Sequence, residues 1–304
     1  MQIPEFIEKD VPLARYSTLG VGGPTAYFAK IDVDSNYPAR SVSVNDQLLE
    51  ACEFARDNCL EVFVLGRGSN VLFGDAGFPG LVLRMQANGI EFSRGGLLVG
   101  SGLLVSTLVS LGKTVGLGGF EFLAGLPGTI GGAIYGNAGC YGGEFWDVIE
   151  EVIFFDGEYV QTQRRHSSMF GYRWSIFKEK PGCIILGAKL KVGLKGKKVI
   201  AGEVRRVREK RLASQPKAKS AGCIFKNPPG GNSRISAGRL IDSASLKGTR
   251  VGDAVISHEQ GNFFVNLGGA KAGDLIELIK IAKGRVYEKF GIILEEEIIR
   301  VGEF

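Results

Sequence analysis

Glycine is the residue type that most constrains how this chain can fold. The 304-residue sequence contains 45 glycines, roughly twice the share of about 7% that is usual in proteins. Glycine loses more backbone entropy on folding than any other residue, so clusters of it indicate positive φ angles or close approach of the backbone to a ligand. The glycines follow no fixed period and gather beside apolar runs. They indicate either many tight turns in a strand-rich protein or loops that hold a ligand.

The longest uncharged stretch, from Phe122 to Gly143, belongs to the same pattern. Its 22 residues are long enough to cross a bilayer, but they include eight glycines, Pro127 and Asn137. This mixture favours a buried cofactor loop, so we expect no membrane insertion. The first residues of the chain carry acidic side chains and lack an apolar core, and we therefore expect no signal peptide.

Charged and metal-binding residues narrow the choice of function. The five cysteines include no C-x-x-C pair, which favours reduced thiols in a cytoplasmic protein. With two histidines, His166 and His258, we expect no metal centre. The net charge is +5, yet residues 194–219 alone hold ten Lys and Arg against two Glu. This basic segment forms either a solvated helix face or a surface that attracts phosphate groups.

Hydrophobic periodicity predicts an α+β fold class, and the length allows two or three domains. We expect a helix over residues 46–58, with Asn45 or Asp46 as its N-cap. A second helix is expected over 198–212, where Ile200, Val204, Val207 and Leu212 share one side. A third is expected over 272–290, with Gly291 as its C-cap. We expect strands from Glu61, on both sides of a Gly77-Phe78-Pro79-Gly80 turn, within 150–193, at 263–266 and in the closing residues 292–302.

Two glycine-rich loops are candidates for ligand binding. The first, Gly66-Arg67-Gly68-Ser69-Asn70, follows a predicted strand as a phosphate loop does. A Rossmann turn requires a third glycine where Val71 stands and then a helix, whereas strand signals follow here. A concave nest of N–H groups remains possible for this loop. The second, Gly125 to Ala133 with Asn137 to Gly142, is rich enough in glycine to pass against a flat ring or a diphosphate.

Three further segments contain residues capable of chemistry. Arg173 lies among aromatic residues in Phe170 to Phe177 and either holds a ligand carboxylate or forms a structural ion pair. Cys223, next to Gly222, Lys226 and Asn227, is either a small core residue or a proton donor at the edge of a loop. In an extended strand, Glu295 and Glu297 share one face and Glu296 the other, so one carboxylate can point inward.

In this order and spacing, the segments resemble the UDP-N-acetylenolpyruvoylglucosamine reductase family over about Thr18 to Gly302. Ser17-Thr18-Leu19-Gly20 also looks like the family's N-terminal signature. The resemblance implies two domains that bind non-covalent FAD in the manner of the vanillyl-alcohol-oxidase (PCMH-type) fold and a third that binds the UDP-sugar. The expected boundaries are 1–86 with 295–304, 87–211, and 212–294. Since we find no inserted tyrosine-bearing loop, we expect the shorter type II subtype.

The resemblance also implies an activity. NADPH reduces FAD, and hydride then reaches the enolpyruvyl group of UDP-N-acetylglucosamine enolpyruvate, which gives UDP-N-acetylmuramate for peptidoglycan synthesis. Arg173 and Glu297 match the family's groups that stabilise the enolate, and Cys223 matches its proton donor. Tyr172, Arg211, Lys226 and Asn227 lie where the family binds substrate. The expected FAD contacts are Gly66, Arg67, Gly68, Ser69, Asn70, Gly125, Pro127, Gly128, Thr129, Gly131, Gly132 and Ala138. Phosphorylated small molecules would then explain the excess of basic residues, so we expect no nucleic-acid partner.

Two departures from the family pattern stand out. The usual proton donor is Ser, and here it is Cys, whose thiol is ordinarily the stronger acid. The segment His258-Glu259-Gln260-Gly261 has Gln-Gly where many relatives have His-Ala, and we assign it no catalytic role. Two rival readings are another flavin oxidoreductase, such as an alcohol oxidase, and a non-catalytic binding protein. No sequence feature indicates an oligomeric state.

Overall fold

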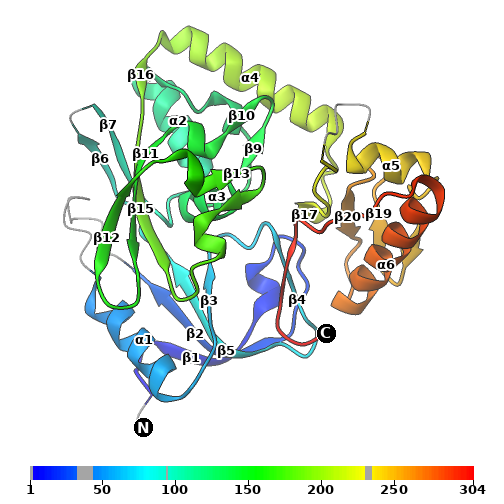
Figure 1. Cartoon of the computed structure of the whole chain (residues 1–304), viewed down its shortest axis with the longest axis horizontal. Helices are drawn as coiled ribbons and strands as arrows, with labels where there is room; N and C mark the ends of the chain where they lie inside the picture. The colour runs from blue at the N-terminus through cyan, green and yellow to red at the C-terminus, as the bar shows by residue number, and fades with distance from the viewer. Residues whose placement is uncertain (1–2, 33–43, 94, 230–234) are drawn as a thin grey trace. The chain divides into compact units, whose positions relative to one another are not determined.

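The structure, a computed structural model, describes residues 3–32, 44–93, 95–229 and 235–304 (Figure 1). The chain forms two compact units, and each is assembled from three separate stretches of sequence. The first unit comprises Met1–Glu8, Tyr27–Arg67 and Gly80–Lys210, and the second comprises Lys9–Ala26, Gly68–Pro79 and Arg211–Phe304. The three-domain boundaries expected from the resemblance stay a prediction.

Within the described residues, two larger sheets and four α-helices make up most of the first unit, and four of these elements (β1, β2, β5 and α4) have some residues in the second. One sheet has the strand order β1-β2-β5-β3, and the other is antiparallel with the order β12-β11-β15-β7-β6. The strands of these sheets are β1 (Ile7–Pro12), β2 (Pro24–Ile31), β3 (Val62–Leu65), β5 (Phe78–Met85), β6 (Ile90–Ser93), β7 (Gly96–Gly100), β11 (Ile149–Phe155), β12 (Val160–Arg164) and β15 (Ile184–Leu190). The helices are α1 (Asp46–Asp57), α2 (Val105–Val115), α3 (Ile130–Gly136) and α4 (Lys197–Ser214). Short paired strands are β8 (Leu117–Gly118) with β16 (Gly193–Leu194), β9 (Gly139–Cys140) with β10 (Gly143–Glu144), and β13 (Phe170–Gly171) with β14 (Trp174–Ser175).

The five-stranded sheet contributes its two faces to two different cores. Side chains at alternate positions of a strand point to opposite faces. Val152 and Phe154 of β11 accordingly pack into one core with α2 and α3. Ile153 and Phe155 pack into the other core, with α1 and the four-stranded sheet. Both faces of β11 are therefore buried, which explains its apolar sequence.

The second unit is a four-stranded sheet with two helices. Its strand order is β17-β20-β19-β18, and its two helices lie beside the sheet (Figure 1). Residues Ala254, Ile256 and Phe264 form a core with the two helices. A parallel pair joins β4 to the last strand, β21, with Val71 opposite Ile299. The elements are β4 (Val71–Phe73), β17 (Lys219–Cys223), β18 (Arg250–Val251), β19 (Ala254–Ile256), β20 (Phe263–Asn266), β21 (Ile299–Val301), α5 (Ala237–Ser243) and α6 (Ala272–Phe290).

Several predicted elements are confirmed, some at their bounds. Helix α1 begins after Asn45, whose side chain accepts a hydrogen bond from the Leu48 N–H. Helix α6 spans Ala272–Phe290 and ends at Gly291, which adopts φ 66°. Strand β20 spans Phe263–Asn266 as expected. The α+β class is likewise confirmed.

Three local predictions are wrong. Phe78-Pro79-Gly80 begins β5 and is not a turn, since proline fits the first residues of a strand. Leu212 is 64% exposed, because the buried positions Ile200, Val204 and Val207 continue at residue 211 on a helix of 3.6 residues per turn. Residues 292–302 form only the short strand β21 and an isolated bridge at Glu296.

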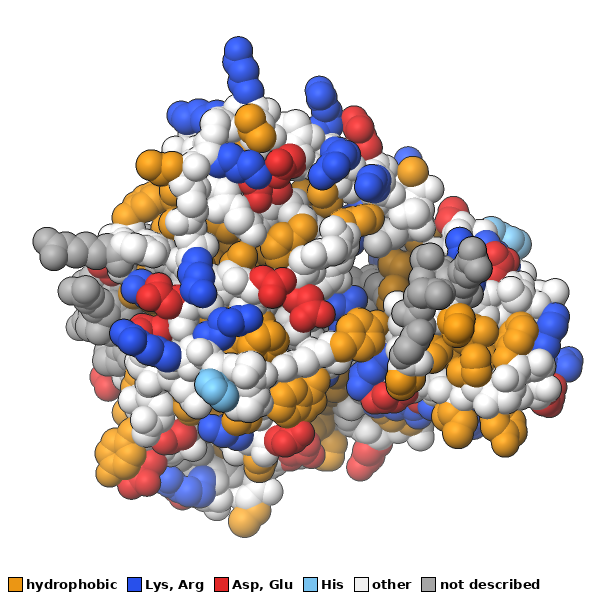
Figure 2. All heavy atoms as spheres, turned by 45° about the horizontal axis from the view of Figure 1, so that its top comes forward, with side chains coloured by type: hydrophobic (Ala, Val, Ile, Leu, Met, Phe, Trp, Pro, Cys, Tyr) orange, Lys and Arg blue, Asp and Glu red, His pale blue; other side chains and the backbone are white. Residues whose placement is uncertain are grey.

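Helix α4 carries much of the basic charge (Figure 2, upper part). Its core contacts come from three residues, and most of its Lys and Arg side chains are exposed. Arg205, for example, has a side chain 78% exposed and pairs with Glu209 one turn on. The helix therefore supports the reading of a solvated face for the larger part of the basic segment. None of the described helices is long and apolar enough to span a membrane.

Candidate functional site

The structure brings the start of the first glycine loop against the second within the first unit. A Cβ atom on Gly66 would lie 2.4 Å from Oγ1 of Thr129, so any larger residue at this position would displace the Thr129 side chain. Thr129 is buried and caps α3, with its hydroxyl accepting a hydrogen bond from the Gly132 N–H. Both loops were predicted to hold FAD, and their contact lets one ligand reach both.

The second loop is buried on one side only, which corrects the expectation of a buried loop. Ile130 and Ile134 pack into the core, whereas Gly125, Pro127 and Gly132 are exposed. The reason lies in the sequence, because the apolar side chains face inward and leave bare glycine backbone outside. Such a surface accepts a ligand against its main chain.

Ser101 adds an observation that the sequence did not single out. Its side chain is 2% exposed, and its Oγ makes no hydrogen bond within the part of the chain that the structure describes. Its main-chain carbonyl accepts from the Gly131 N–H at 2.8 Å. A buried hydroxyl normally has a partner, so an unsatisfied one beside the glycine loops fits a polar ligand such as FAD. In the sequence, Ser101 is marked only by its position, after the end of a strand and before the start of a helix.

The rest of the first loop lies in the second unit. Gly68 adopts φ 65°, and a Cβ there would lie 1.9 Å from the Tyr16 carbonyl oxygen. The Gly68 carbonyl accepts a hydrogen bond from the Thr18 N–H. The Asn70 side chain donates to the Glu297 carbonyl at 3.0 Å. Asn70 is therefore engaged with the C-terminal segment in this structure.

Arg173 occupies the tip of a hairpin in the first unit. Strands β13 and β14 pair so that Tyr172 and Arg173 form the two-residue connection. Arg173 adopts φ 55°, a left-handed conformation that costs a bulky residue roughly 1–2 kcal/mol. Strain of this kind collects at functional sites. Arg173 donates to the Gly139 carbonyl at 2.9 Å, and its guanidinium lies 5.3 Å from the Tyr172 ring centre.

Asn137 supports this hairpin and was missed as a functional residue. It is fully buried, and its amide donates to the Gly171 carbonyl at 2.7 Å and to Glu144 at 2.8 Å. Its carbonyl also lies 3.5 Å from the Arg173 guanidinium. Asn137 ends α3 at φ 43°, which asparagine tolerates better than most residues. It links the glycine-rich stretch to the Arg173 hairpin.

Cys223 lies at the end of β17 in the second unit, next to a β-bulge. The pairing of β17 with β20 shifts register between Ser220 and Cys223, and Gly222 adopts φ 76°. Bulges redirect side chains and are common beside active sites. The half-buried Cys223 is thus not a core residue.

The segment after Cys223 is paired with the three C-terminal glutamates. The Glu297 N–H donates to the Ile224 carbonyl at 2.8 Å, and the Lys226 N–H donates to the Glu295 carbonyl at 2.8 Å. The backbone therefore brings Cys223 and Glu297 into neighbouring segments of the second unit. Arg173 belongs to the first unit.

The three glutamates were expected to alternate between the two faces of a strand, but they do not lie in a regular strand. Glu296 is the best shielded, with a side chain 16% exposed, and it pairs with Lys283 and Arg300. The Glu295 side chain is 71% exposed and pairs with Lys226. Burial raises the pKa of Glu296, but hydrogen bonds from Arg300 and Lys283 outweigh this effect and hold the pKa below its usual range. The segment is irregular here, so strand alternation does not apply.

The remaining predicted substrate residues lie in both units. Tyr172 is exposed in the first unit. In the second, the Asn227 side chain accepts a hydrogen bond from the Ala237 N–H at 3.0 Å, and Arg211 donates to Gln215 at 3.2 Å. Within the described ranges, no group of three His, Cys, Asp or Glu side chains is placed to hold a metal ion.

Comparison with known proteins agrees with this arrangement. Residues 41–162 match the sequence model of an FAD binding domain. Residues 215–301 match the model of the UDP-N-acetylenolpyruvoylglucosamine reductase C-terminal domain. The predicted FAD-binding module, with FAD as its cofactor, is therefore confirmed.

Similarity to individual proteins extends over the whole chain. UDP-N-acetylenolpyruvoylglucosamine reductase of Thermus thermophilus is 41% identical over 98% of this chain and 99% of its own length. That of Rubrobacter xylanophilus is 36% identical over 97% and 95%. The crystal structure of the Thermus caldophilus enzyme (MurB) is 38% identical, with a TM-score of 0.77 over 97% of this chain and 100% of that one. The chain therefore belongs to the UDP-N-acetylenolpyruvoylglucosamine reductase family, whose members are FAD-dependent oxidoreductases.

Proposed function

We propose that this protein reduces the enolpyruvyl group of UDP-N-acetylglucosamine enolpyruvate to UDP-N-acetylmuramate, with NADPH as the source of electrons. Full-length similarity to reductases of this name carries the proposal. The proposal places the protein in the synthesis of peptidoglycan precursors. A cytoplasmic location agrees with it and stays a prediction.

The glycine loops would hold FAD, which when bound passes hydride from NADPH to the substrate. Gly66 lets the first loop pack directly against Thr129, and Ser101 offers a buried hydroxyl. Gly125 is exposed and carries no side chain, so its main-chain groups would be accessible to the ligand. These groups would orient the ligand.

Arg173 would stabilise the negative charge that develops on the substrate, and Glu297, in its protonated form, would assist by donating a hydrogen bond. Hydride addition to the methylene carbon leaves negative charge on the neighbouring carbon and its carboxylate. A guanidinium binds a carboxylate through two parallel hydrogen bonds, and a pre-positioned cation lowers the barrier because it needs no reorganisation. The strained hairpin supports this role for Arg173, since folding has already fixed its backbone.

Cys223 would complete the reaction by donating its thiol proton to the carbon next to the carboxylate. The thiolate then regains a proton from water. Tyr172, Arg211, Lys226 and Asn227 would bind the UDP-sugar. Lys226 and Asn227 follow Cys223 closely along the chain, so a phosphate or sugar held by them stays beside the proton donor.

Anaerobic absorbance spectroscopy tests the overall reaction. We expect the purified protein to carry the yellow colour of oxidised flavin, to bleach with NADPH, and to recover its colour when the UDP-enolpyruvyl sugar is added. Failure to bleach would favour a non-catalytic binding protein. Bleaching without recovery on this sugar would favour a flavin oxidoreductase with another substrate.

Substitution of Cys223 tests the proton donor. We expect Cys223→Ala to leave flavin reduction by NADPH within about twofold of the parent and to slow reoxidation by the sugar by roughly 10²–10⁴-fold, the usual contribution of a positioned acid. Cys223→Ser is the matched control, because serine is the usual residue of the family, and it should retain most of the activity. Stopped-flow absorbance separates the two half-reactions. Equal slowing of both would rule out this role for Cys223.

A further inference from the structure

We propose that Asn262 is a positioning residue for proton delivery. It holds the backbone between Cys223 and Glu297, and it thereby sets the distance between the proton donor and the carboxylate. Asn262 lies immediately after the Gln260-Gly261 pair that departs from the family pattern. The inference depends on the roles proposed above for Cys223 and Glu297.

The first observation is a reciprocal pair of hydrogen bonds between the Asn262 side chain and Phe225. The Phe225 N–H donates to Oδ1 of Asn262 at 2.9 Å, and Nδ2 of Asn262 donates to the Phe225 carbonyl at 2.8 Å. The Asn262 carbonyl also accepts from the Ile224 N–H at 2.9 Å. Asn262 is 3% exposed and Phe225 is 1% exposed, so water does not compete for these groups.

The position of the hydrogen bonds between Asn262 and Phe225 along the sheet explains their role. Cys223 pairs with Phe263 at the last position of the β17–β20 ladder. One further main-chain hydrogen bond, from the Ile224 N–H to the Asn262 carbonyl, continues the pairing, and at Phe225 the side-chain amide of Asn262 takes the place of a partner peptide group. Only an amide offers a donor and an acceptor side by side, as the partner peptide requires.

The opposite edge of the same segment carries Glu297. The Ile224 carbonyl accepts from the Glu297 N–H at 2.8 Å, and Phe225 forms a bridge with Glu296. Residues 224–226 are therefore hydrogen-bonded on both sides, to Asn262 on one and to the glutamates on the other. Loss of the hydrogen bonds from the Asn262 side chain would allow Cys223 and Glu297 to shift relative to each other.

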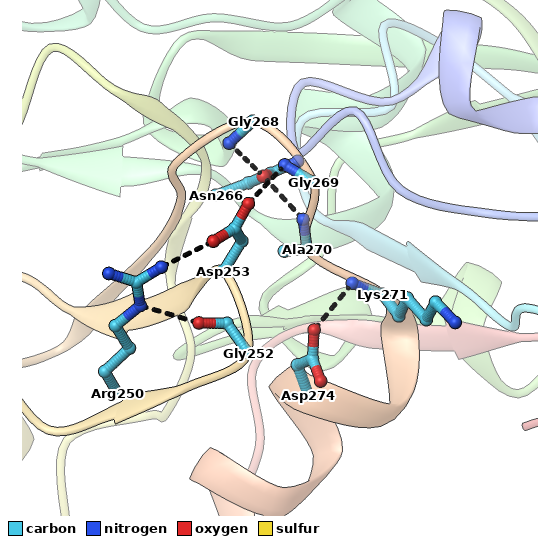
Figure 3. A network of polar contacts seen from close by, with 9 residues as sticks. All are labelled: Arg250, Gly252, Asp253, Asn266, Gly268, Gly269, Ala270, Lys271 and Asp274. Atoms are coloured by element: carbon cyan, nitrogen blue, oxygen red, sulfur yellow. Dashed lines mark hydrogen bonds and ion pairs between the residues drawn. The ribbon is translucent and has the colours of Figure 1, made fainter.

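Asn266, the last residue of β20, provides a matched control. It is 4% exposed, and its side chain accepts hydrogen bonds from the Gly268 and Ala270 N–H groups (Figure 3). The same side chain donates to the Leu19 carbonyl at 2.9 Å. These side-chain hydrogen bonds lead away from residues 223–226 and 295–297, although substitution removes a comparable number of polar contacts. Asn262→Ala and Asn266→Ala thus remove similar buried amides from the start and the end of β20.

The experiment compares both variants with Cys223→Ala by stopped-flow absorbance and by hydrogen exchange. We expect Asn262→Ala to leave flavin reduction by NADPH within about twofold and to slow reoxidation by the sugar at least about tenfold, with faster exchange in peptides covering 223–226 and 295–298. Asn266→Ala should slow neither half-reaction selectively and should leave those peptides unchanged. Asn262→Asp keeps the shape and the hydrogen-bond acceptor, and it should slow reoxidation less than Asn262→Ala. It is the variant to measure if Asn262→Ala fails to fold.

Two results would overturn the positioning role. One is equal slowing of both half-reactions in the Asn262 variants, and the other is the same selective slowing in Asn266→Ala. If Cys223→Ala slows only reoxidation by the sugar and the Asn262 variants do not, Cys223 remains the proposed proton donor and the positioning role of Asn262 is rejected. If Cys223→Ala is itself not selective, the proposed donor falls, and so does the positioning role that depends on it.

Discussion

At the scale of single residues, the C-terminal glutamates show how three identical side chains diverge in environment. Glu295 is exposed, Glu296 is shielded between two cations, and Glu297 is held by its main chain to Ile224 and Asn70. The two cations hold Glu296 in the charged form. Glu297 is the glutamate for which the family resemblance implies a catalytic role.

Replacement of Glu296 should be destabilising in a pH-dependent way. We expect Glu296→Gln to lower the free energy of unfolding by about 1.5–3 kcal/mol at pH 7, the range for hydrogen bonds to charged groups. Because the folded-state pKa of Glu296 is depressed, its stabilisation is present above the ordinary value of about 4.3 and is lost as the pH falls through the folded pKa. Urea unfolding at several pH values measures this difference.

Glu295→Gln is the control for that measurement. Its side chain is 71% exposed, and exposed ion pairs contribute about 0–1 kcal/mol. A loss in Glu295→Gln equal to that in Glu296→Gln, or a difference that stays constant down to low pH, would contradict the account of Glu296.

At the scale of elements, two glycines of α6 should respond in opposite directions to the same substitution. Gly291 ends the helix at φ 66°, where alanine is strained, so Gly291→Ala should cost roughly 1 kcal/mol. Gly284 lies exposed inside the helix with open space around its Cβ position, so Gly284→Ala should stabilise by about 0.5–1 kcal/mol. Thermal unfolding followed by circular dichroism measures both. The same sign for the two variants would show that local helix geometry does not decide their effect.

The elements also divide into those that the sequence predicts and those that it does not. Helix α6 is predicted at its bounds because an apolar stripe and a terminal glycine lie within one continuous segment. The Arg173 hairpin depends on Asn137, and the segment after Cys223 depends on Asn262 and on residues 295–297. These partners lie far away in sequence, so periodicity does not reveal them. The residue identities Arg173, Cys223 and Glu297 came from family resemblance, and their roles stay proposals.

At the scale of the whole molecule, the second unit depends on segments from both ends of the chain. Leu19, Val21 and Leu72 are each at most 3% exposed and complete a core otherwise built from residues 221–298. Burial of such side chains contributes about 1.5–3 kcal/mol each, and a domain's net stability is about 5–15 kcal/mol. We therefore expect a fragment of residues 211–304 to lack a cooperative thermal transition that the full chain retains. Cooperative unfolding of the fragment would contradict this expectation.

The pairing of β4 with β21 has a consequence for synthesis on the ribosome. Val71 meets its partner Ile299 only after the 227 residues between them have been made. At about 5–20 residues per second, that interval lasts on the order of ten to fifty seconds, during which the edge of β4 that pairs with β21 is exposed. The second unit is therefore completed long after its first segments are made, and Glu297 is among the last of its residues to be added.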